Sequence, residues 1–210
     1  MKNILDILES VGGYIKNSHI VGTSGKHISE YLNKDAIYPH TAVASEVGKM
    51  MAELVKNLEM DAVVSPAVGG VVLSQWIAFH LSQIKGREIL GIYTEKTADG
   101  GQELKRGYDK LIKGKKVVVV EDIINTGGSA KKVVDVVRAL GAEVVAVVVM
   151  VNRNPDEVTS EYFGAPFFAL ETRSFAAYEE KDCPMCKEGA PINTTVGHGK
   201  KYLEAKLRTI

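Results

Sequence analysis

The stretch from residue 116 to 129, KVVVVEDIINTGGS, constrains both the fold and the chemistry of this chain. Its run of valines predicts a buried strand that ends in two adjacent carboxylates, Glu121 and Asp122. A small polar turn at 126–129 then opens an amphipathic helix. Unpaired backbone amides at a helix N-terminus favour a phosphate, and glycines let it approach the backbone closely. The stretch therefore predicts a phosphate-binding loop.

The acidic pair indicates the rest of the ligand. Carboxylates do not bind the phosphate itself, because like charges repel. They suit hydroxyl groups or a divalent cation instead. We therefore expect a ligand with phosphate at one end and a diol beside it, which describes a sugar phosphate.

The same stretch resembles the signature with which type I phosphoribosyltransferases bind 5-phosphoribosyl-1-pyrophosphate (PRPP). That signature is an apolar strand, an acidic pair, two apolar residues, a variable position and Thr-Gly-Gly-Ser or Thr-Gly-Gly-Thr. The alternative is an ordinary strand-to-helix turn with Ser129 as the helix N-cap. The resemblance implies that Glu121 and Asp122 fix the ribose diol during catalysis. It implies a PRPP loop made of Asn125, Thr126, Gly127, Gly128 and Ser129.

Apolar periodicity alternates between strand and helix patterns in the middle of the chain. Strands are expected at 62–64, 89–93, 117–120 and 144–151, with helices at 43–58, 71–81 and 129–140. This order predicts an α/β fold with a mainly parallel sheet flanked by helices and ligands at the carboxyl ends of the strands. Residues 1–35 and 166–210 lack the rhythm. They are predicted to form a small hood from both termini, with the CxxC tail in the second segment, around a PRPP-binding core at 36–165.

A second strand-to-helix turn, SPAVGG at residues 65–70, resembles the pyrophosphate loop of the same family. Proline and glycine punctuate many such turns, so this motif alone is weak. Beside the main motif, it implies that Val68, Gly69 and Gly70 contact pyrophosphate. Some orotate enzymes have a lysine where this chain has Gly69, so that charge is missing here.

The polar segment 93–108 has two interpretations. Its composition favours a solvated β-hairpin. It also resembles the mobile catalytic loop of orotate phosphoribosyltransferases, which closes over pyrophosphate, often across a dimer interface. That resemblance implies a homodimer and a catalytic role for Lys96, with Lys105 and Arg106 as further cations for substrate.

Two segments concern the base. Ser24, Gly25 and Lys26 resemble the hood segment that covers the base in orotate enzymes, although Thr23 stands where some members have lysine. Arg153 matches the arginine that pairs with the orotate carboxylate, and its alternative is a surface arginine that caps the sheet. Asn125 stands where orotate enzymes commonly have threonine. Because asparagine both donates and accepts, it suits a pyrimidine or a purine.

The tail contains the only cysteines, Cys183 and Cys186, in a CxxC motif also found in a subgroup of orotate enzyme-like sequences. With His198 they supply three zinc ligands, one fewer than a closed structural site needs. A reduced thiol pair in a turn is the favoured interpretation. His19, His27, His40 and His80 have no ligand-like spacing and are expected to be packing or surface residues.

Composition narrows the class of partner. The 26 basic and 26 acidic residues give a formal net charge of zero, which provides no global field for nucleic acid or anionic membrane. No apolar run is long enough to span a bilayer, and the N-terminus lacks a signal-peptide core, so we expect a cytoplasmic protein.

Together the resemblances imply a Mg²⁺-dependent glycosyltransferase that transfers phosphoribosyl from PRPP to a nucleobase, orotate first, in pyrimidine nucleotide synthesis. A purine or xanthine phosphoribosyltransferase would keep every motif on the sugar side and differ around the base. A regulator that binds PRPP or nucleotides on the same fold without catalysis is the other alternative. The cations of segment 93–108 speak against the regulator.

Overall fold

The computed structural model describes residues 3–207, which divide into two compact units. The first unit consists of Ile37–Ser174 together with Asn3 and Ile4. The second consists of Leu5–Ala36 and the described residues from Phe175 onward, so both ends of the chain contribute to it. Each unit is described by itself below.

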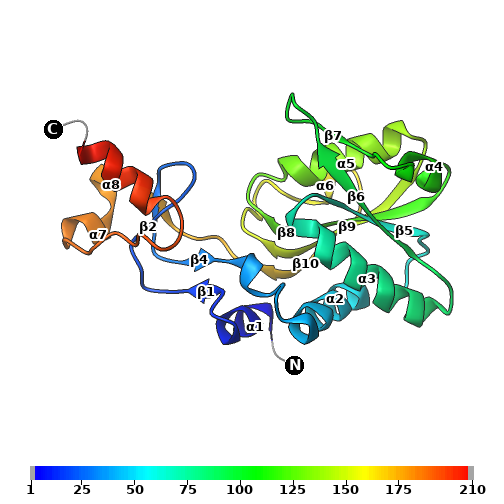
Figure 1. Ribbon diagram of the computed structural model, residues 1–210, viewed down its shortest axis with the longest axis horizontal. Coiled ribbons are helices and arrows are strands. Elements are labelled where there is room, and N and C mark those ends of the chain that lie inside the picture. Colours follow the sequence, from blue (N-terminus) through cyan, green and yellow to red (C-terminus); the bar gives the residue numbers. More distant parts are fainter. Residues whose placement is uncertain (1–2, 208–210) are drawn as a thin grey trace. The chain divides into compact units, whose positions relative to one another are not determined.

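The first unit is built on a six-stranded sheet in the order β10-β9-β8-β5-β6-β7 (Figure 1). Every neighbouring pair is parallel except β6 and β7. The predicted mainly parallel sheet is confirmed. The strands are β5 (Ala62–Pro66), β6 (Leu90–Lys96), β7 (Gln102–Glu103), β8 (Lys116–Ile124), β9 (Glu143–Asn152) and β10 (Phe167–Thr172).

The helices of the first unit connect these strands. They are α2 (Thr41–Val55), α3 (Gly69–Lys85), α4 (Tyr108–Ile112), α5 (Gly128–Ala139) and α6 (Ser160–Phe163). Gly86, with φ of 64°, ends α3 in the left-handed conformation that glycine adopts readily. Within residues 3–207, no helix combines the length and apolar character needed to cross a membrane.

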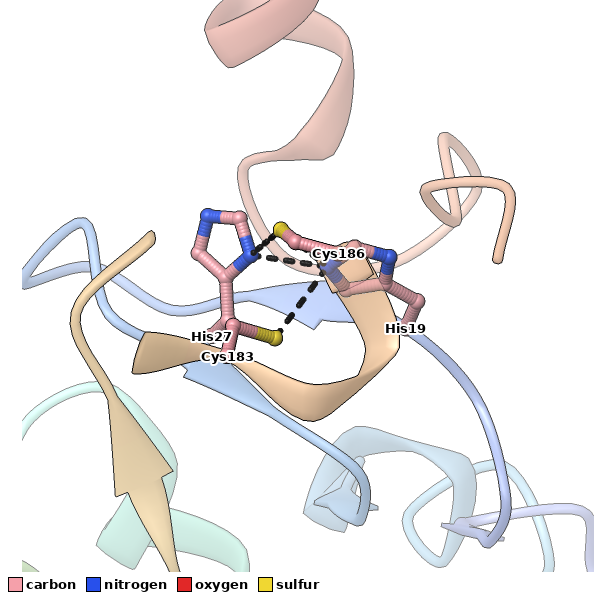
Figure 2. Close-up of side chains that lie close together, drawn as sticks. All are labelled: His19, His27, Cys183 and Cys186. Carbon is pink, nitrogen blue, oxygen red and sulfur yellow. Dashed lines mark hydrogen bonds between the residues drawn. The ribbon is translucent and has the colours of Figure 1, made fainter. Parts of the chain in front are cut away.

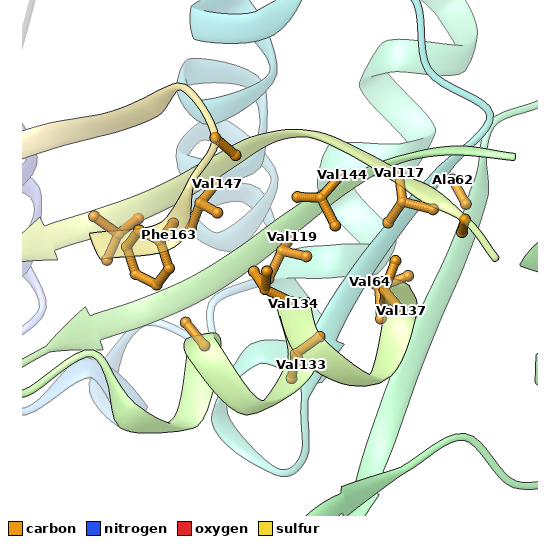
Figure 3. Packing of buried hydrophobic residues seen from close by; sticks show 14 of the residues in the cluster. Ala62, Val64, Val117, Val119, Val133, Val134, Val137, Val144, Val147 and Phe163 are labelled. Atoms are coloured by element: carbon orange, nitrogen blue, oxygen red, sulfur yellow. The ribbon is translucent and has the colours of Figure 1, made fainter. Parts of the chain in front are cut away.

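Helices cover both faces of the sheet, which explains why the central strands are apolar without alternation. On one face, Val133, Val134 and Val137 of α5 pack toward Val117 and Val119 (Figure 3). The intervening strand residues point to the opposite face, against which α2 and α3 pack. All of these valines are fully buried. Each contributes about 1.5 kcal/mol or more by leaving water.

The predicted boundary between core and C-terminal hood, at residue 166, is wrong. β10 pairs in parallel with β9, with Phe167 opposite Val147 and Ala169 opposite Val149. The sheet therefore continues to Thr172, and the first unit ends at Ser174. β10 is an edge strand with half-buried side chains, so its sequence lacks the continuous apolar run that marks the central strands.

The second unit contains two small antiparallel sheets, β1-β4 and β11-β3-β2. In the larger sheet, β11 from the C-terminal part of the chain pairs with β3 from the N-terminal part, so this sheet joins the two segments. Helix α1 begins at Ile4, which belongs to the first unit, and its remaining residues belong to the second unit. The elements are α1 (Ile4–Ser10), β1 (Tyr14–Ile15), β2 (Ile20–Val21), β3 (His27–Ile28), β4 (Tyr31–Leu32), η1 (Lys34–Ala36), β11 (Ala177–Tyr178), η2 (Glu180–Asp182), α7 (Pro184–Lys187) and α8 (Gly199–Leu207).

Candidate active site

The acidic pair lies inside the carboxyl end of β8, which continues to Ile124. Because successive strand residues point to opposite faces, the two carboxylates separate. Glu121 lines a cavity with the loop that leads to α5, whereas Asp122 Oδ2 lies 3.3 Å from the Tyr38 hydroxyl. The two residues are 8% and 5% exposed. The pair thus presents one carboxylate to each face of the sheet, near the carboxyl end of β8.

The loop of residues 125–129 encloses a cavity of about 120 Å³ together with Glu121. Gly127 has φ of 74°, and α5 begins at the next residue. The first amides of a helix have no partner within it, and the helix dipole adds positive potential there. Typical pockets for whole ligands measure about 300–1,000 Å³. The smaller cavity therefore suits one phosphate group of a larger ligand.

Gly127 has two reasons to be glycine. Its positive φ is costly for other residues, and a Cβ there would lie 2.7 Å from Cε1 of Tyr162. We expect Gly127→Ala to lower the free energy of unfolding by about 1–3 kcal/mol and to weaken phosphate binding as the loop shifts. Thermal melts and the KM for PRPP measure the two effects.

Gly141→Ala is the matched control for this prediction. Gly141 has φ of 80°, but a Cβ there would meet nothing within 4 Å. It should cost backbone strain alone and leave the KM for PRPP unchanged. If the two variants behave alike, the contact between Gly127 and Tyr162 has no effect on the loop.

The turn at 65–70 connects β5 to α3 and lies against the neighbouring strand. The backbone N–H of Ala67 donates to the carbonyl oxygen of Thr94 at 2.9 Å, and the peptide bond between Ala67 and Val68 is cis. Val68 is 86% exposed. A Cβ on Gly70 would meet Ser65 Cβ at 2.7 Å, so only glycine fits this close approach.

Tyr38 connects this turn to the acidic pair. Its hydroxyl donates to the carbonyl oxygen of Gly69 at 2.7 Å and lies 3.3 Å from Asp122 Oδ2. Tyr38 stands before α2, far from both motifs in sequence, and matches no pattern in the sequence analysis. A lone tyrosine between a hood segment and a helix gives no signal that could have identified it.

Segment 93–108 forms an antiparallel hairpin in which Glu95 pairs with Glu103 and Lys96 with Gln102. The tip rests toward α5, where Lys132 Nζ donates to the carbonyl oxygen of Gly100 at 2.6 Å. The hairpin expected from composition is therefore the conformation present. Whether it moves during catalysis stays a prediction.

The three cations of the hairpin differ in their surroundings. Lys105 Nζ lies 2.8 Å from a Glu103 oxygen, and Arg106 Nε donates to Glu95 at 2.8 Å. These hydrogen bonds raise the pKa of Lys105 and the pKa of Arg106. Lys96 is exposed and forms no ion pair with any of the described residues. Lys96 can therefore reach a ligand without breaking an ion pair, whereas Lys105 and Arg106 cannot.

Arg153 follows β9 and lies beside the end of β8. Its backbone N–H donates to the carbonyl oxygen of Ile124 at 2.9 Å, directly before Asn125. The side chain of Asn152 holds the turn, because it accepts from the Asn154 N–H at 3.0 Å and donates to the Val158 carbonyl at 3.1 Å. Arg153 is half-buried. The fold therefore places Arg153 next to the variable position of the main motif.

The predicted base-covering residues lie in a tight turn of the second unit. The Gly22 N–H donates to the Lys26 carbonyl at 2.8 Å, and Gly25 has φ of 81°. Ser24 and Gly25 are exposed, and Lys26 Nζ lies 3.5 Å from a Glu179 oxygen. Their contact with a base stays a prediction.

Comparisons with known proteins decide the family. Residues 33–165 match the model described as the phosphoribosyl transferase domain. This chain belongs to the phosphoribosyltransferase family. It is 33% identical over 191 residues to the orotate phosphoribosyltransferase of Caldanaerobacter subterraneus subsp. tengcongensis, covering 91% of this chain and 94% of that protein. It is 35% identical over 199 residues to that of Thermotoga maritima, covering 94% of this chain and 100% of the relative.

A solved structure agrees on the fold. The Mycobacterium tuberculosis H37Rv orotate phosphoribosyltransferase in complex with PRPP aligns with a TM-score of 0.61 and 22% identity. The alignment covers 81% of this chain and 96% of that one. The predicted family and fold are confirmed, and the chain is a phosphoribosyltransferase enzyme. The roles of its individual site residues stay predictions.

The cysteines of this phosphoribosyltransferase lie in a group that the sequence did not reveal. His19, His27, Cys183 and Cys186 bring one ligand atom each to within 4.8 Å of one another (Figure 2). His198 is not a member of this group. Burial lowers the pKa of His27, and the nearby His19 lowers it further. His19 and His27 are buried, as expected of packing residues, and both also lie against the sulfur of Cys186.

Proposed function

We propose that this phosphoribosyltransferase transfers the 5-phosphoribosyl group of PRPP to orotate, forming orotidine 5′-phosphate and pyrophosphate in pyrimidine nucleotide synthesis. The observation that carries the proposal is the buried acidic pair of β8, with Glu121 beside the loop at the start of α5. The names of the relatives support orotate as the base, and the place of Arg153 beside Asn125 agrees with it.

In this proposal each element of the site has a task. The amides of residues 126–129 bind the 5-phosphate, and Glu121 in the same cavity accepts hydrogen bonds from the ribose diol. The turn at 68–70 receives the pyrophosphate, which Lys96 reaches from the hairpin. Tyr38 fixes Asp122 relative to that turn, because its hydroxyl lies close to both Gly69 and Asp122. Positioning supplies most of the catalysis, since no side-chain nucleophile is needed.

The reaction breaks the bond between C1 of the ribose and the pyrophosphate oxygen, and the bonding electron pair leaves with pyrophosphate. A nitrogen of orotate attacks C1 through a transition state with positive charge on the ribose ring, and the proton of that nitrogen is lost to water or to the released pyrophosphate. Glu121 and Asp122 stabilise that charge, because their carboxylates are held in a buried setting before the charge develops.

Mg²⁺ fits this donor set. Carboxylate oxygens are its preferred protein ligands, and it commonly binds through one or two carboxylates together with substrate phosphates. Glu121 and Asp122 each offer such oxygens on their own face of the sheet, so one of them would hold the ion together with PRPP, which would supply most of the ligands. The ion would neutralise the charge of the leaving pyrophosphate.

A nucleobase panel tests the proposal. The enzyme is incubated with PRPP, Mg²⁺ and one base at a time, namely orotate, uracil, hypoxanthine, xanthine or adenine, and pyrophosphate release is followed. We expect release with orotate and little with the others. Turnover of a purine in place of orotate would transfer the assignment to purine or xanthine salvage. PRPP binding without release for any base would indicate a non-catalytic regulator.

Lys96→Ala should reduce the catalytic rate by about one to two powers of ten with a smaller effect on PRPP affinity. A loop cation that meets the leaving group acts chiefly in the transition state. Single-turnover rates and a binding titration with PRPP separate the two quantities. Lys113→Ala, an exposed lysine at the end of α4, is the matched control. Parent-like single-turnover rates in Lys96→Ala would move the role to Lys105 or Arg106.

The proposal extends to the setting of the enzyme. We propose a cytoplasmic homodimer, with PRPP and a nucleobase as its ligands and no nucleic acid or membrane as a partner. The zero net charge and the small size of the substrates support a protein that binds neither nucleic acid nor membrane. The dimer follows the family resemblance of the hairpin. Gel filtration with light scattering measures the oligomeric state.

A further inference from the structure

Four side chains of the second unit converge from segments far apart in the sequence (Figure 2). His19 lies directly before β2, and His27 is the first residue of β3. Cys183 precedes α7, and Cys186 lies within it. Three of the four are buried and Cys186 is half-buried. Two nitrogens and two sulfurs thus gather where the two ends of the chain meet.

Three sulfur–nitrogen distances within this group are close to those between the ligands of one metal ion. Cys183 Sγ lies 3.8 Å and Cys186 Sγ 3.6 Å from His19 Nε2. Cys186 Sγ also lies 3.2 Å from His27 Nδ1. A tetrahedral zinc ion, with Zn–S of about 2.3 Å and Zn–N of about 2.0 Å, places sulfur and nitrogen ligands about 3.5 Å apart. The sulfur–nitrogen distances match this geometry.

The two ring nitrogens are closer together. His19 Nε2 and His27 Nδ1 lie 2.7 Å apart, whereas tetrahedral zinc would hold two nitrogens about 3.3 Å apart. The two nitrogens would have to move apart by roughly 0.6 Å, which small rotations of the two rings allow, for an ion to bind between them.

The orientation of His19 is fixed from outside the group. Its Nδ1 lies 2.8 Å from the carbonyl oxygen of Ala190. A carbonyl only accepts, so Nδ1 carries the proton and Nε2 is the nitrogen that faces the cysteines as a possible metal ligand. Such a hydrogen bond from the second ring nitrogen is typical of metal-binding histidines.

The backbone holds this arrangement on both sides of His19. The Asn193 N–H donates to the carbonyl oxygen of His19 at 2.7 Å, and the Ala190 N–H donates to that of Met185 at 2.9 Å. The chain after α7 therefore returns past His19 and keeps the Ala190 carbonyl in place. The site is built by main-chain contacts and does not depend on one flexible loop.

We propose that His19, His27, Cys183 and Cys186 bind one structural zinc ion. Four protein ligands of type Cys₂His₂ fill a tetrahedral zinc site and leave no position for substrate. Two thiolates also balance the charge of Zn²⁺, so the buried site is neutral.

The site would stabilise the second unit. That unit consists of two short segments, of its two sheets only the three-stranded one joins both segments, and small units of this kind commonly depend on a metal or a disulfide. The ion ties His19 and His27 of the first segment to Cys183 and Cys186 of the second. Its binding energy is then part of the folding energy of the unit.

Metal content and ligand type test the proposal on the full-length protein. Protein purified under reducing conditions without chelator should contain about one zinc per chain by inductively coupled plasma mass spectrometry. X-ray absorption at the zinc edge should show two sulfur and two nitrogen neighbours. Exchange for Co²⁺ should give the ligand-field absorption of a tetrahedral site and a sulfur-to-cobalt charge-transfer band.

Variants identify the ligands. Cys186→Ser and His19→Ala should each lower the zinc content at least tenfold, whereas His198→Ala should keep the parent content. His198 is the matched control because it lies in the same unit but outside the group. Should the ligand variants fail to fold, the cobalt spectrum of the parent still decides the ligand set. Activity is not the readout, because a chelator would also remove Mg²⁺.

Three results would overturn the proposal. One is a parent protein without zinc that binds neither added Zn²⁺ nor Co²⁺ when its thiols are reduced. Another is loss of zinc in His198→Ala with retention in His19→Ala. The third is a Cys183–Cys186 disulfide, found by mass spectrometry in protein purified without added oxidant, in place of a metal.

Discussion

Replacing Asp122 by asparagine is expected to lower kcat/KM by about two to three powers of ten, the range typical of losing one preorganised electrostatic contact. The substitution keeps the shape of the side chain and removes its charge. Asp122 Oδ1 accepts from the N–H of Ile123 at 2.6 Å, and an amide oxygen can replace it there. The fold should therefore persist while stabilisation of the positive ribose is lost.

Steady-state kinetics with PRPP and thermal melting measure this prediction. Asp135→Asn is the matched control, since Asp135 is an exposed residue of α5 that pairs only with Lys131 among the described residues. The control should keep both activity and melting temperature. Glu121→Gln should lower kcat/KM about as much as Asp122→Asn, because each substitution removes the carboxylate from one face of the sheet. A fully active Asp122→Asn enzyme would refute the PRPP assignment of the motif.

The core of the fold could be predicted because its strands are buried on both faces. The β-branched valine runs in β8 and β9 favour buried strands, and both strands form where expected. The edge strand β10 and the two-residue strands of the second unit were missed. Their side chains are half-buried or few, so no periodicity distinguishes them from loop.

The site could be predicted only in part. The turn at 65–70 and the loop after β8 can be recognised from sequence, because their glycines come soon after a predicted strand and, in the second case, an acidic pair. Opposite orientations of Glu121 and Asp122 follow from strand geometry once β8 is known to extend to Ile124. The contact of Tyr38 with both motifs depends on the packing of the chain before α2, which no local pattern records.

The cysteine motif shows the same limit more sharply. The CxxC spacing, with His198 as a third potential ligand, favours a reduced thiol pair over zinc. The histidines that lie beside the cysteines are His19 and His27, more than 150 positions away along the chain. They lie there because strand β11 pairs with β3 and because the backbone N–H of Asn193 donates to the carbonyl oxygen of His19. Pairing between the two ends of a chain is not encoded in the spacing of either end.

Arg153→Ala should raise the KM for orotate by about one to three powers of ten, because a charge-assisted contact to a carboxylate contributes about 1.5–3 kcal/mol and more when buried. The backbone of Arg153 is fixed to Ile124, and a half-buried guanidinium can hold a planar carboxylate with two parallel hydrogen bonds. Lysine cannot reproduce this fork, so Arg153→Lys should recover only part of the affinity.

Uracil provides the control on the substrate side and Arg87→Ala the control on the protein side. Uracil lacks the carboxylate, so it should be a poor substrate for the parent and lose nothing further in Arg153→Ala. Arg87 is a surface arginine near Glu59 and Asp61, and its removal should leave the KM for orotate unchanged. If Arg153→Ala keeps the parent KM, Arg153 only caps the sheet and base selection must come from Asn125 or the second unit. The assignment of PRPP would survive, because it depends on Glu121, Asp122 and the loop that follows them.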